Sequence, residues 1–306
     1  MKKVLVATEK PFAAVAVDGI RKEIEGAGHE LVLLEKYTEV GQLLEAVADA
    51  DAMIVRSDKV TPEVIDAGAA LKLVVRAGAG VDAIDTKYAK EKGVVVENTP
   101  GQNANAVAEL VFGMLLYTVR NRYDGKAGTE LKGRKMGLLA FGNTGKNVAR
   151  VAKGFGMDVY AYDAFCPAEV IEAAGVKPVG SPEELFGTCD IVSLHIPKTP
   201  DTVGSINYDL VGRLPKGGIL VNTARQEVIN EPDVARLLAD RGDLSFITDI
   251  KPGNDEELKA FGNRYFSTPK KMGAQTAEAN INAGIAAAKQ IVAFLADGTV
   301  MYQVNK

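Results

Sequence analysis

A glycine-containing turn between two apolar runs is the first feature of this sequence that could hold a charged ligand. Residues 135 to 163 follow the order strand, turn, helix, strand, and the turn carries Gly142 and Gly145. A dinucleotide-binding turn needs glycine where the backbone approaches the pyrophosphate and where helix and strand pack closely. The tight-turn position of the usual pattern holds Ala140, the mildest change from glycine. We therefore predict a dinucleotide-binding site here.

An acidic residue at the end of the second apolar run agrees with this prediction. Asp163 follows Gly142 by 21 residues, close to the spacing at which such folds place a carboxylate that accepts hydrogen bonds from the adenosine ribose. A carboxylate at this position favours NAD over NADP. We expect NAD as the cofactor, with Asn143 and Thr144 in the phosphate-binding turn. An ordinary strand-to-helix connection is the alternative, but it would not explain Asp163.

One arginine stands where a substrate could bind. Arg225 follows the apolar run 218–221, at the carboxyl end of an expected strand, where open α/β sheets gather their ligands. A guanidinium can bind a carboxylate through two hydrogen bonds and polarise the adjacent C2 oxygen. The alternative is a surface arginine that caps a helix.

The elements that must position these groups alternate along the chain. Short apolar runs and amphipathic helical patterns predict an α/β fold of two Rossmann-like, doubly wound domains with a cleft between them. A long apolar helix is expected over Asn103–Arg120, and an alanine-rich last helix over Ala277–Ala296. This last helix should return to the first domain. We thus expect a discontinuous substrate-binding domain, residues 1–98 and 282–306, and an NAD-binding Rossmann domain, residues 99–281.

Composition excludes several classes of function. The chain has 306 residues, of which 47% are apolar and 25% charged, and its net charge is −4. A general binder of nucleic acid or of anionic membranes needs an excess of Lys and Arg. No uninterrupted apolar run approaches the ~18 residues of a spanning helix, and the start of the chain lacks a secretory apolar region. Cys166 and Cys189 fit neither a disulfide framework nor a metal site. We expect a cytoplasmic protein without a metal.

Six further segments show that the chain resembles the D-2-hydroxyacid dehydrogenases. They are VRSDKVT (55–61), RAGAGVD (76–82), NTPGQNANAVAE (98–109), DIVSLHIPKTPDT (190–202), GGILVNTARQEVINE (217–231) and TPKKMGAQTAEAN (268–280). The resemblance implies an NAD-dependent dehydrogenase acting on a CH–OH group. VRS and RAGAGVD favour the branch that oxidises 3-phosphoglycerate to 3-phosphohydroxypyruvate, the first step of serine biosynthesis. The chain is similar to the short form of that branch, so serine feedback through an appended domain is not expected.

The resemblance also implies where the cofactor and the substrate bind. On the cofactor it places His195, Ile196, Pro197, Thr202, Thr223, Ala224, Asp249 and Gly273. For the substrate, which carries a carboxylate and a phosphate, the candidates are Arg56, Ser57, Arg76, Ala77, Gly78 and Asn103. Arg56 is the preferred phosphate ligand. Members of the family are commonly homodimers through the nucleotide domain, and the apolar helix over 103–120 is a candidate interface element.

The general base departs from the family pattern. The family has a histidine directly after a Thr-Pro pair and a supporting glutamate, whereas this chain has Lys270 and Lys271 near the first position and Asn254 at the second. A lysine base needs burial and a neighbouring cation such as Arg225 to favour its neutral form. Both lysines are candidates, with Lys270 ahead, and a solvated pair on a loop is the alternative. The only histidines, His29 and His195, are expected to be structural or peripheral rather than catalytic, with His195 at the adenosine side of the cofactor.

Two other functions stay open. A glyoxylate or hydroxypyruvate reductase of the same family would accept unphosphorylated substrates without depending on Arg56. A non-catalytic NAD(H)-sensing binding protein would explain the missing histidine and glutamate.

Overall fold

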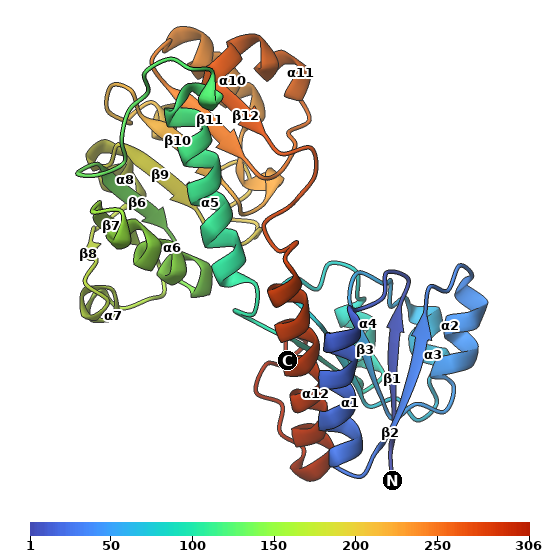
Figure 1. Ribbon diagram of the computed structural model, residues 1–306. Helices are drawn as coiled ribbons and strands as arrows, with labels where there is room; N and C mark the ends of the chain where they lie inside the picture. Colours follow the sequence, from blue (N-terminus) through green and yellow to red (C-terminus); the bar gives the residue numbers. More distant parts are fainter. The chain divides into compact units, whose positions relative to one another are not determined.

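The computed structural model describes all 306 residues. The chain forms two compact units, one of Met1–Asn103 with Thr276–Lys306 and one of Ala104–Gln275. Each unit is a parallel sheet with helices on both faces (Figure 1). The prediction of two Rossmann-like α/β domains is confirmed. The chain passes between the units after Asn103 and again after Gln275, a few residues from the boundaries expected at 98 and 281.

The first unit contains a five-stranded sheet in the order β2-β1-β3-β4-β5. Its strands are β1 (Lys3–Thr8), β2 (Glu30–Glu35), β3 (Ala52–Val55), β4 (Leu73–Arg76) and β5 (Val95–Asn98). Its helices are α1 (Ala14–Gly26), α2 (Val40–Val47), α3 (Pro62–Ala67), α4 (Thr86–Glu91) and α12 (Ala277–Asp297). Val4 and Val6 face α1 and α12, whereas Leu5 and Ala7 face α2 and α3. Because both faces are covered, the central strands are continuous apolar runs.

Helix α12 joins the end of the chain to its beginning. Its buried face consists mainly of alanine and glycine, and it packs along α1. Gly19 and Gly284 allow the close approach, since a Cβ atom on Gly19 would lie 2.6 Å from Ile285. By length and composition alone α12 could cross a membrane, a property that core helices share. Here it completes the core of the first unit.

The second unit contains a seven-stranded sheet in the order β12-β11-β10-β9-β6-β7-β8. Its strands are β6 (Lys135–Leu139), β7 (Asp158–Tyr162), β8 (Lys177–Pro178), β9 (Ile191–Leu194), β10 (Ile219–Asn222), β11 (Ser245–Thr248) and β12 (Tyr265–Ser267). Its α-helices are α5 (Ala104–Val119), α6 (Asn143–Gly154), α7 (Ala168–Ala173), α8 (Pro182–Thr188), α9 (Tyr208–Val211), α10 (Glu231–Asp240) and α11 (Asp255–Leu258). Short 3₁₀ turns lie at Asn121–Tyr123, Gln226–Val228 and Lys259–Arg264. α5 and α6 cover one face, and α8 and α10 cover the other.

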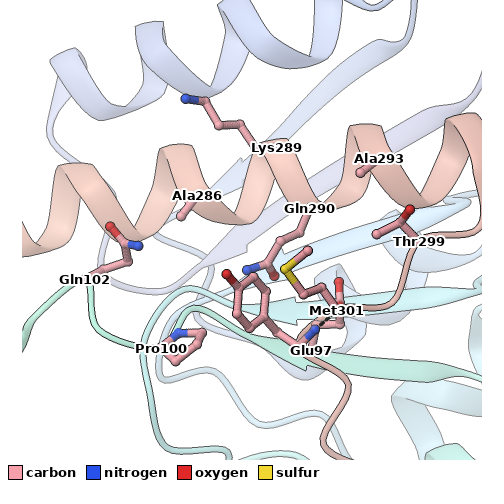
Figure 2. A pocket seen from close by; sticks show the side chains of 10 residues that line it. Glu97, Pro100, Gln102, Ala286, Lys289, Gln290, Ala293, Thr299 and Met301 are labelled. Carbon is pink, nitrogen blue, oxygen red and sulfur yellow. Dashed lines mark hydrogen bonds between the residues drawn. The ribbon is translucent and has the colours of Figure 1, made fainter. Parts of the chain in front are cut away.

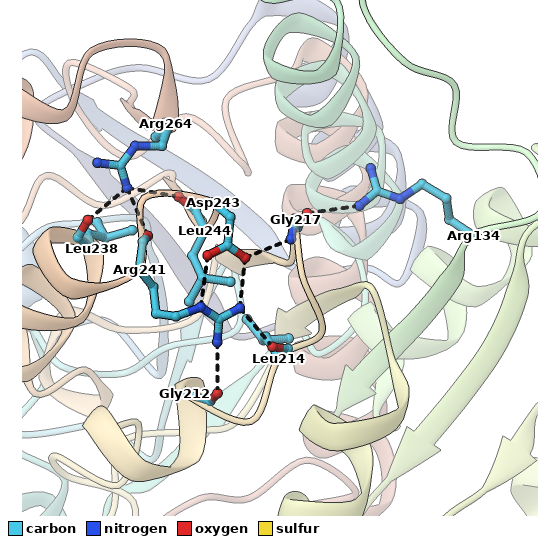
Figure 3. Close-up of polar contacts among 9 residues, drawn as sticks. All are labelled: Arg134, Gly212, Leu214, Gly217, Leu238, Arg241, Asp243, Leu244 and Arg264. Carbon is cyan, nitrogen blue, oxygen red and sulfur yellow. Dashed lines mark hydrogen bonds and ion pairs between the residues drawn. The ribbon is translucent and has the colours of Figure 1, made fainter.

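Arginine side chains fix the connections that enter β10 and β11 (Figure 3). The guanidinium of Arg241 donates two hydrogen bonds to Asp243, at 2.8 and 2.7 Å, and Asp243 also accepts from the backbone N–H of Gly217 at 2.9 Å. Arg264 donates to three backbone carbonyl oxygens, including that of Leu238. These bonds secure the amino ends of the two strands whose carboxyl ends carry the candidate site.

Candidate functional site

The glycine turn follows β6 and leads directly into α6. Gly142 precedes the helix, and no side chain caps the helix there. A Cβ atom on Gly142 would meet nothing within 4 Å, whereas one on Gly145 would lie 2.4 Å from the carbonyl oxygen of Ala140. Gly142 thus leaves open space beside the backbone N–H groups of Asn143 and Thr144, and Gly145 permits close packing. This is the division of roles that a phosphate-binding turn requires.

Ala140 adopts a backbone conformation that favours glycine. Its φ is +83°, a left-handed value that is strained for a residue with a Cβ atom. The alanine in the first position of the pattern therefore occupies a true tight turn.

Asp163 fastens the glycine turn to the end of β7. One carboxylate oxygen accepts from the N–H of Phe141 at 2.7 Å, and the other accepts from Phe165 and Cys166 at 2.8 and 2.9 Å. Burial acts to raise the pKa of Asp163, but these hydrogen bonds and nearby Lys146 lower it below its usual value. The carboxylate is therefore ionised, and the one lone pair that remains on the oxygen bound to Phe141 suits a ribose hydroxyl group.

Two buried polar atoms at the carboxyl ends of the adjacent strands β9 and β10 lack partners within the chain. They are Nε2 of His195, after β9, and Oγ1 of Thr223, after β10. Burial lowers the pKa of His195 to about 4, so its ring is neutral near pH 7. Buried polar atoms are normally hydrogen-bonded, and a polar cofactor beside these strand ends would satisfy both. Together with the open space at Gly142, they make the residues present fit a dinucleotide.

The segment after His195 forms a turn that its own side chains hold. Oγ1 of Thr202 donates to the carbonyl oxygen of Pro197 at 2.6 Å and accepts from the N–H of Thr199 at 2.8 Å. Ile196 is partly buried against the core below β9 and β10. Cys189 lies in the same core, and burial raises its pKa to about 12, so it is a structural residue.

Arg225 and Lys271 meet at one backbone oxygen. Nη1 of Arg225 and Nζ of Lys271 both donate to the carbonyl oxygen of Ala224, at 2.9 and 3.3 Å. Two cations from segments 46 residues apart are thereby gathered at the carboxyl end of β10. Lys270 is exposed and its side chain makes no hydrogen bond or ion pair with the chain.

Asp249 is fully buried at the end of β11. Its carboxylate accepts from the hydroxyl of Thr268 at 2.9 Å and from the N–H groups of Met272 and Gly273, both at 2.7 Å. The side chain thus holds the loop that carries the two lysines. Asn254 lies elsewhere, with its amide donating to Glu257 and to a backbone carbonyl.

The substrate residues predicted in the first unit lie at the ends of adjacent strands β3 and β4. Arg56 donates to the carbonyl oxygens of Lys10 and Pro11, at 2.8 and 2.9 Å, and to the side-chain oxygen of Asn280 at 2.7 Å. Three of its five N–H groups are therefore engaged, and its Nε–H and one Nη2–H are left. Ser57 beside it is exposed.

Arg76 reaches from the end of β4 to the end of β3, where its Nε donates to the carbonyl oxygen of Arg56 at 2.9 Å. Its guanidinium covers Gly78, whose φ is +147° and where a Cβ atom would overlap the arginine. Ala77, which lies between Arg76 and Gly78 in the sequence, is buried. Asn103 is the last residue of this unit, immediately before α5.

Sequence reasoning missed Asn280 and Asp58. Asn280 is a polar residue in the first turn of the alanine-rich helix α12, and it binds Arg56. Asp58 is buried and accepts from the N–H groups of Glu9 and Arg56 and from the hydroxyl of Tyr37. A polar amide within the apolar stretch 277–296 could have pointed to Asn280. The sequence around Asp58 contains no pattern that distinguishes this residue.

A hollow of about 260 Å³ lies in the first unit between α12, the end of β5 and the C-terminal tail (Figure 2). Its lining includes Glu97, Gln290 and Met301. Oε1 of Glu97 accepts from the N–H of Tyr302 at 2.7 Å. None of the predicted site residues lines this hollow.

Comparison with known proteins gives consistent matches. Residues 113–263 match the family described as "D-isomer specific 2-hydroxyacid dehydrogenase, NAD binding domain". A D-3-phosphoglycerate dehydrogenase of Methanocaldococcus jannaschii is 37% identical over 82% of this chain and 51% of that protein. A hydroxypyruvate reductase of Thermotoga maritima is 37% identical over 86% of this chain and 90% of that protein. The chain thus spans about half the length of several curated relatives that it matches.

A solved structure covers the whole chain. An NAD⁺-bound 3-phosphoglycerate dehydrogenase of Entamoeba histolytica superposes with a TM-score of 0.89 at 46% identity, over 100% of this chain and 99% of that one. A D-lactate dehydrogenase of Escherichia coli, at 22% identity and a TM-score of 0.78, shares the fold.

Proposed function

Because the chain belongs to the D-isomer specific 2-hydroxyacid dehydrogenase family and carries its NAD-binding domain, we propose that it is an NAD-dependent dehydrogenase that oxidises 3-phosphoglycerate to 3-phosphohydroxypyruvate. This reaction would supply serine biosynthesis in the cytoplasm. The observation that carries the proposal is the convergence of Arg225 and Lys271 on the carbonyl oxygen of Ala224. Relatives named D-3-phosphoglycerate dehydrogenase support the substrate.

The chemistry divides between the two cations. The bound cofactor would supply the hydride acceptor at the substrate's C2. The guanidinium of Arg225 would bind the substrate carboxylate and polarise the C2 oxygen. Nζ of Lys271 would accept the proton of the C2 hydroxyl group. A neighbouring guanidinium disfavours a second positive charge, so Arg225 favours the neutral amine that this step needs.

The geometry favours Lys271 over Lys270 as the base. The sequence put Lys270 ahead because the count from Pro269 reaches it first. Both lysines are exposed, but only the Nζ atom of Lys271 lies within 3.3 Å of the oxygen that also accepts from Arg225, whereas Lys270 makes no contact with that group. A base must lie close to the group that binds the substrate carboxylate, because the carboxylate and the hydroxyl are on adjacent carbon atoms.

The first unit would supply the remaining substrate ligands. Arg56 keeps two N–H groups for an anion, and these suit the phosphate. The N–H groups near Gly78 suit the carboxylate. The engagement of Arg56 with the chain also agrees with the second candidate function, a glyoxylate or hydroxypyruvate reductase, since such an enzyme would not need Arg56 for a phosphate. The relative from Thermotoga maritima supports that alternative.

The assay follows NADH absorbance with purified protein and either 3-phosphohydroxypyruvate or hydroxypyruvate. We expect kcat/KM for the phosphorylated substrate to be higher by about tenfold or more, because one charge-assisted contact is worth that factor. A preference for hydroxypyruvate would support the reductase. Binding of NADH without oxidation of the cofactor by either substrate would support a sensing protein and exclude both enzymes.

A homodimer is part of the proposal. Light scattering on the purified protein tests it, and a mass equal to one 32.5 kDa chain would exclude it.

A further inference from the structure

Two buried polar side chains at neighbouring strand ends, Asn222 and Asp249, organise the loops that carry the two proposed catalytic cations. β10 ends at Asn222, and Asp249 immediately follows β11. These strands are adjacent and parallel, and the N–H of Asp249 donates to the carbonyl oxygen of Asn222 at 2.9 Å. Both side chains are almost completely inaccessible, with 1% of Asn222 and 0% of Asp249 exposed.

Asn222 fixes the loop that contains Arg225. Its side-chain oxygen accepts from the N–H of Ala224 at 2.9 Å, and its side-chain nitrogen donates to the carbonyl oxygen of Arg225 at 3.0 Å. These two bonds set the direction of the Ala224 carbonyl, the group to which both cations donate.

Asp249 fixes the loop that contains Lys271. All three of its acceptor contacts, to Thr268, Met272 and Gly273, lie on that loop and bracket the lysine on both sides. Gly273 can approach because it has no side chain, since a Cβ atom there would lie 3.0 Å from Oδ2 of Asp249. The carboxylate therefore controls where the backbone of Lys271 runs.

We propose that Asp249 is a positioning residue for the proton-transfer step, and that it acts through the backbone of the lysine loop while Asn222 holds the matching loop of Arg225. The effects on kcat that this inference predicts rest on the proposed function. The inference adds a second role to Asp249, which the family resemblance placed on the cofactor. Complete burial and three contacts to one loop indicate that its carboxylate serves the position of Lys271.

Kinetics of the single and double variants test the proposal. Asp249→Asn should lower kcat by roughly ten- to a hundredfold, because misplacement of a catalytic group by about 1 Å has such an effect. Saturating NAD⁺ in the assay keeps any change in cofactor affinity out of kcat. In a Lys271→Ala background, Asp249→Asn should lower kcat by less than about twofold further, because there is no base left to position. Full additivity of the two effects would overturn the proposal.

Two substitutions of Thr268 disturb the contacts of Asp249 less than Asp249→Asn does, and they should leave the fold intact. Thr268→Val removes one of the three bonds to Asp249, and Thr268→Ser retains it. We expect a severalfold loss of kcat in the valine variant and near wild-type kcat in the serine variant. Equal kcat values for the two variants would contradict the proposal.

Hydrogen exchange separates failure of this inference from failure of the proposed function. If the wild-type protein has no turnover, the proposed function fails, but the contacts of Asp249 still predict faster amide exchange at residues 268–273 in Asp249→Asn. Unchanged exchange in this segment, at equal thermal stability, would overturn the positioning role by itself.

Discussion

Arg225 and Lys271 bring two positive charges to one carbonyl oxygen, at 2.9 and 3.3 Å. On the proposed mechanism, Arg225 binds the substrate carboxylate and Lys271 is the base. Lys270, the residue before Lys271, is equally exposed but makes no contact with the Ala224 carbonyl. Substitutions of Lys270 and Lys271 therefore provide a matched comparison within one loop.

Lys271→Ala should lower kcat by about 10²- to 10⁴-fold, the usual range for loss of a general base. Lys270→Ala should stay within about twofold of the wild type. Steady-state oxidation of 3-phosphoglycerate at several pH values measures both. If the two variants lose activity equally, or if Lys270→Ala loses more, Lys271 is not the base.

His195 ties folding stability to pH. Burial lowers the pKa of His195 in the folded protein to about 4, whereas an unfolded histidine has its ordinary value near 6.5. Between these values the unfolded chain binds more protons than the folded one, so stability falls as the pH drops from about 6.5 toward 4. His195 therefore makes its full contribution to the free energy of unfolding above about pH 6.5.

At pH 5 this linkage should reduce the free energy of unfolding by up to about 2 kcal/mol relative to pH 7.5. Urea unfolding of the cofactor-free protein at both pH values measures the total change. His195→Gln should show a change smaller by about that amount, since glutamine does not titrate. An identical pH dependence in both proteins would show that His195 is already protonated or equally solvated in the folded state.

The turn between β6 and α6 combines three residues with different requirements. Ala140 has φ +83°, Gly142 faces open space and Gly145 abuts a backbone carbonyl. Three small substitutions at this one element therefore have three separate expected outcomes.

Ala140→Gly should stabilise the protein by about 1 kcal/mol, because glycine adopts positive φ without strain. Gly145→Ala should destabilise it by about 1–3 kcal/mol, because its Cβ atom would overlap the Ala140 carbonyl. Gly142→Ala should leave stability nearly unchanged but weaken NADH binding about tenfold or more, because the methyl group fills the space that a phosphate needs. Urea unfolding and fluorescence titration measure the two quantities. Unchanged NADH affinity in Gly142→Ala would place the phosphates elsewhere.

On the scale of the whole chain, helix α12 makes the first unit discontinuous. The chain leaves this unit after Asn103 and returns at Thr276, and α12 then packs along α1 through Gly19 and Gly284. The tail beyond α12 continues along β5, where the N–H of Val304 donates to the carbonyl oxygen of Val96 at 2.9 Å. The last thirty-one residues therefore belong to the same core as the first hundred.

Gly284→Leu should destabilise the protein by about 1–3 kcal/mol, because a Cβ atom at this position already lies 3.0 Å from Ile20 and a larger side chain must separate the two helices. Gly41→Leu is the control, since Gly41 lies in α2 and a Cβ atom there would meet nothing within 4 Å, and a better helix former should be neutral or slightly stabilising there. The urea concentrations at the midpoints of unfolding of the two variants test this prediction. Equal midpoints would mean that α1 and α12 do not depend on close contact.

Local patterns were sufficient for most of the elements. The strand expected at 218–221 and the two long helices expected over 103–120 and 277–296 lie within one residue of those bounds at each end, because buried parallel strands are continuous apolar runs and helices show apolar residues at regular spacing. The short helices α7, α8, α9 and α11 and the two-residue strand β8 were not predicted. Their patterns are too brief to be distinguished from loops.

The sequence by itself determined the α/β class and NAD as cofactor through apolar periodicity, glycine spacing and Asp163, and it indicated the family through the resemblance of six segments. All of these are properties of short stretches. Only the tertiary structure decided what Arg56 contacts, which of two adjacent lysines lies beside Arg225, and that Asp249 holds their loop. These are hydrogen bonds between segments that are distant along the chain. Their partners depend on positions in space, which adjacent strand ends establish and spacing in the sequence does not.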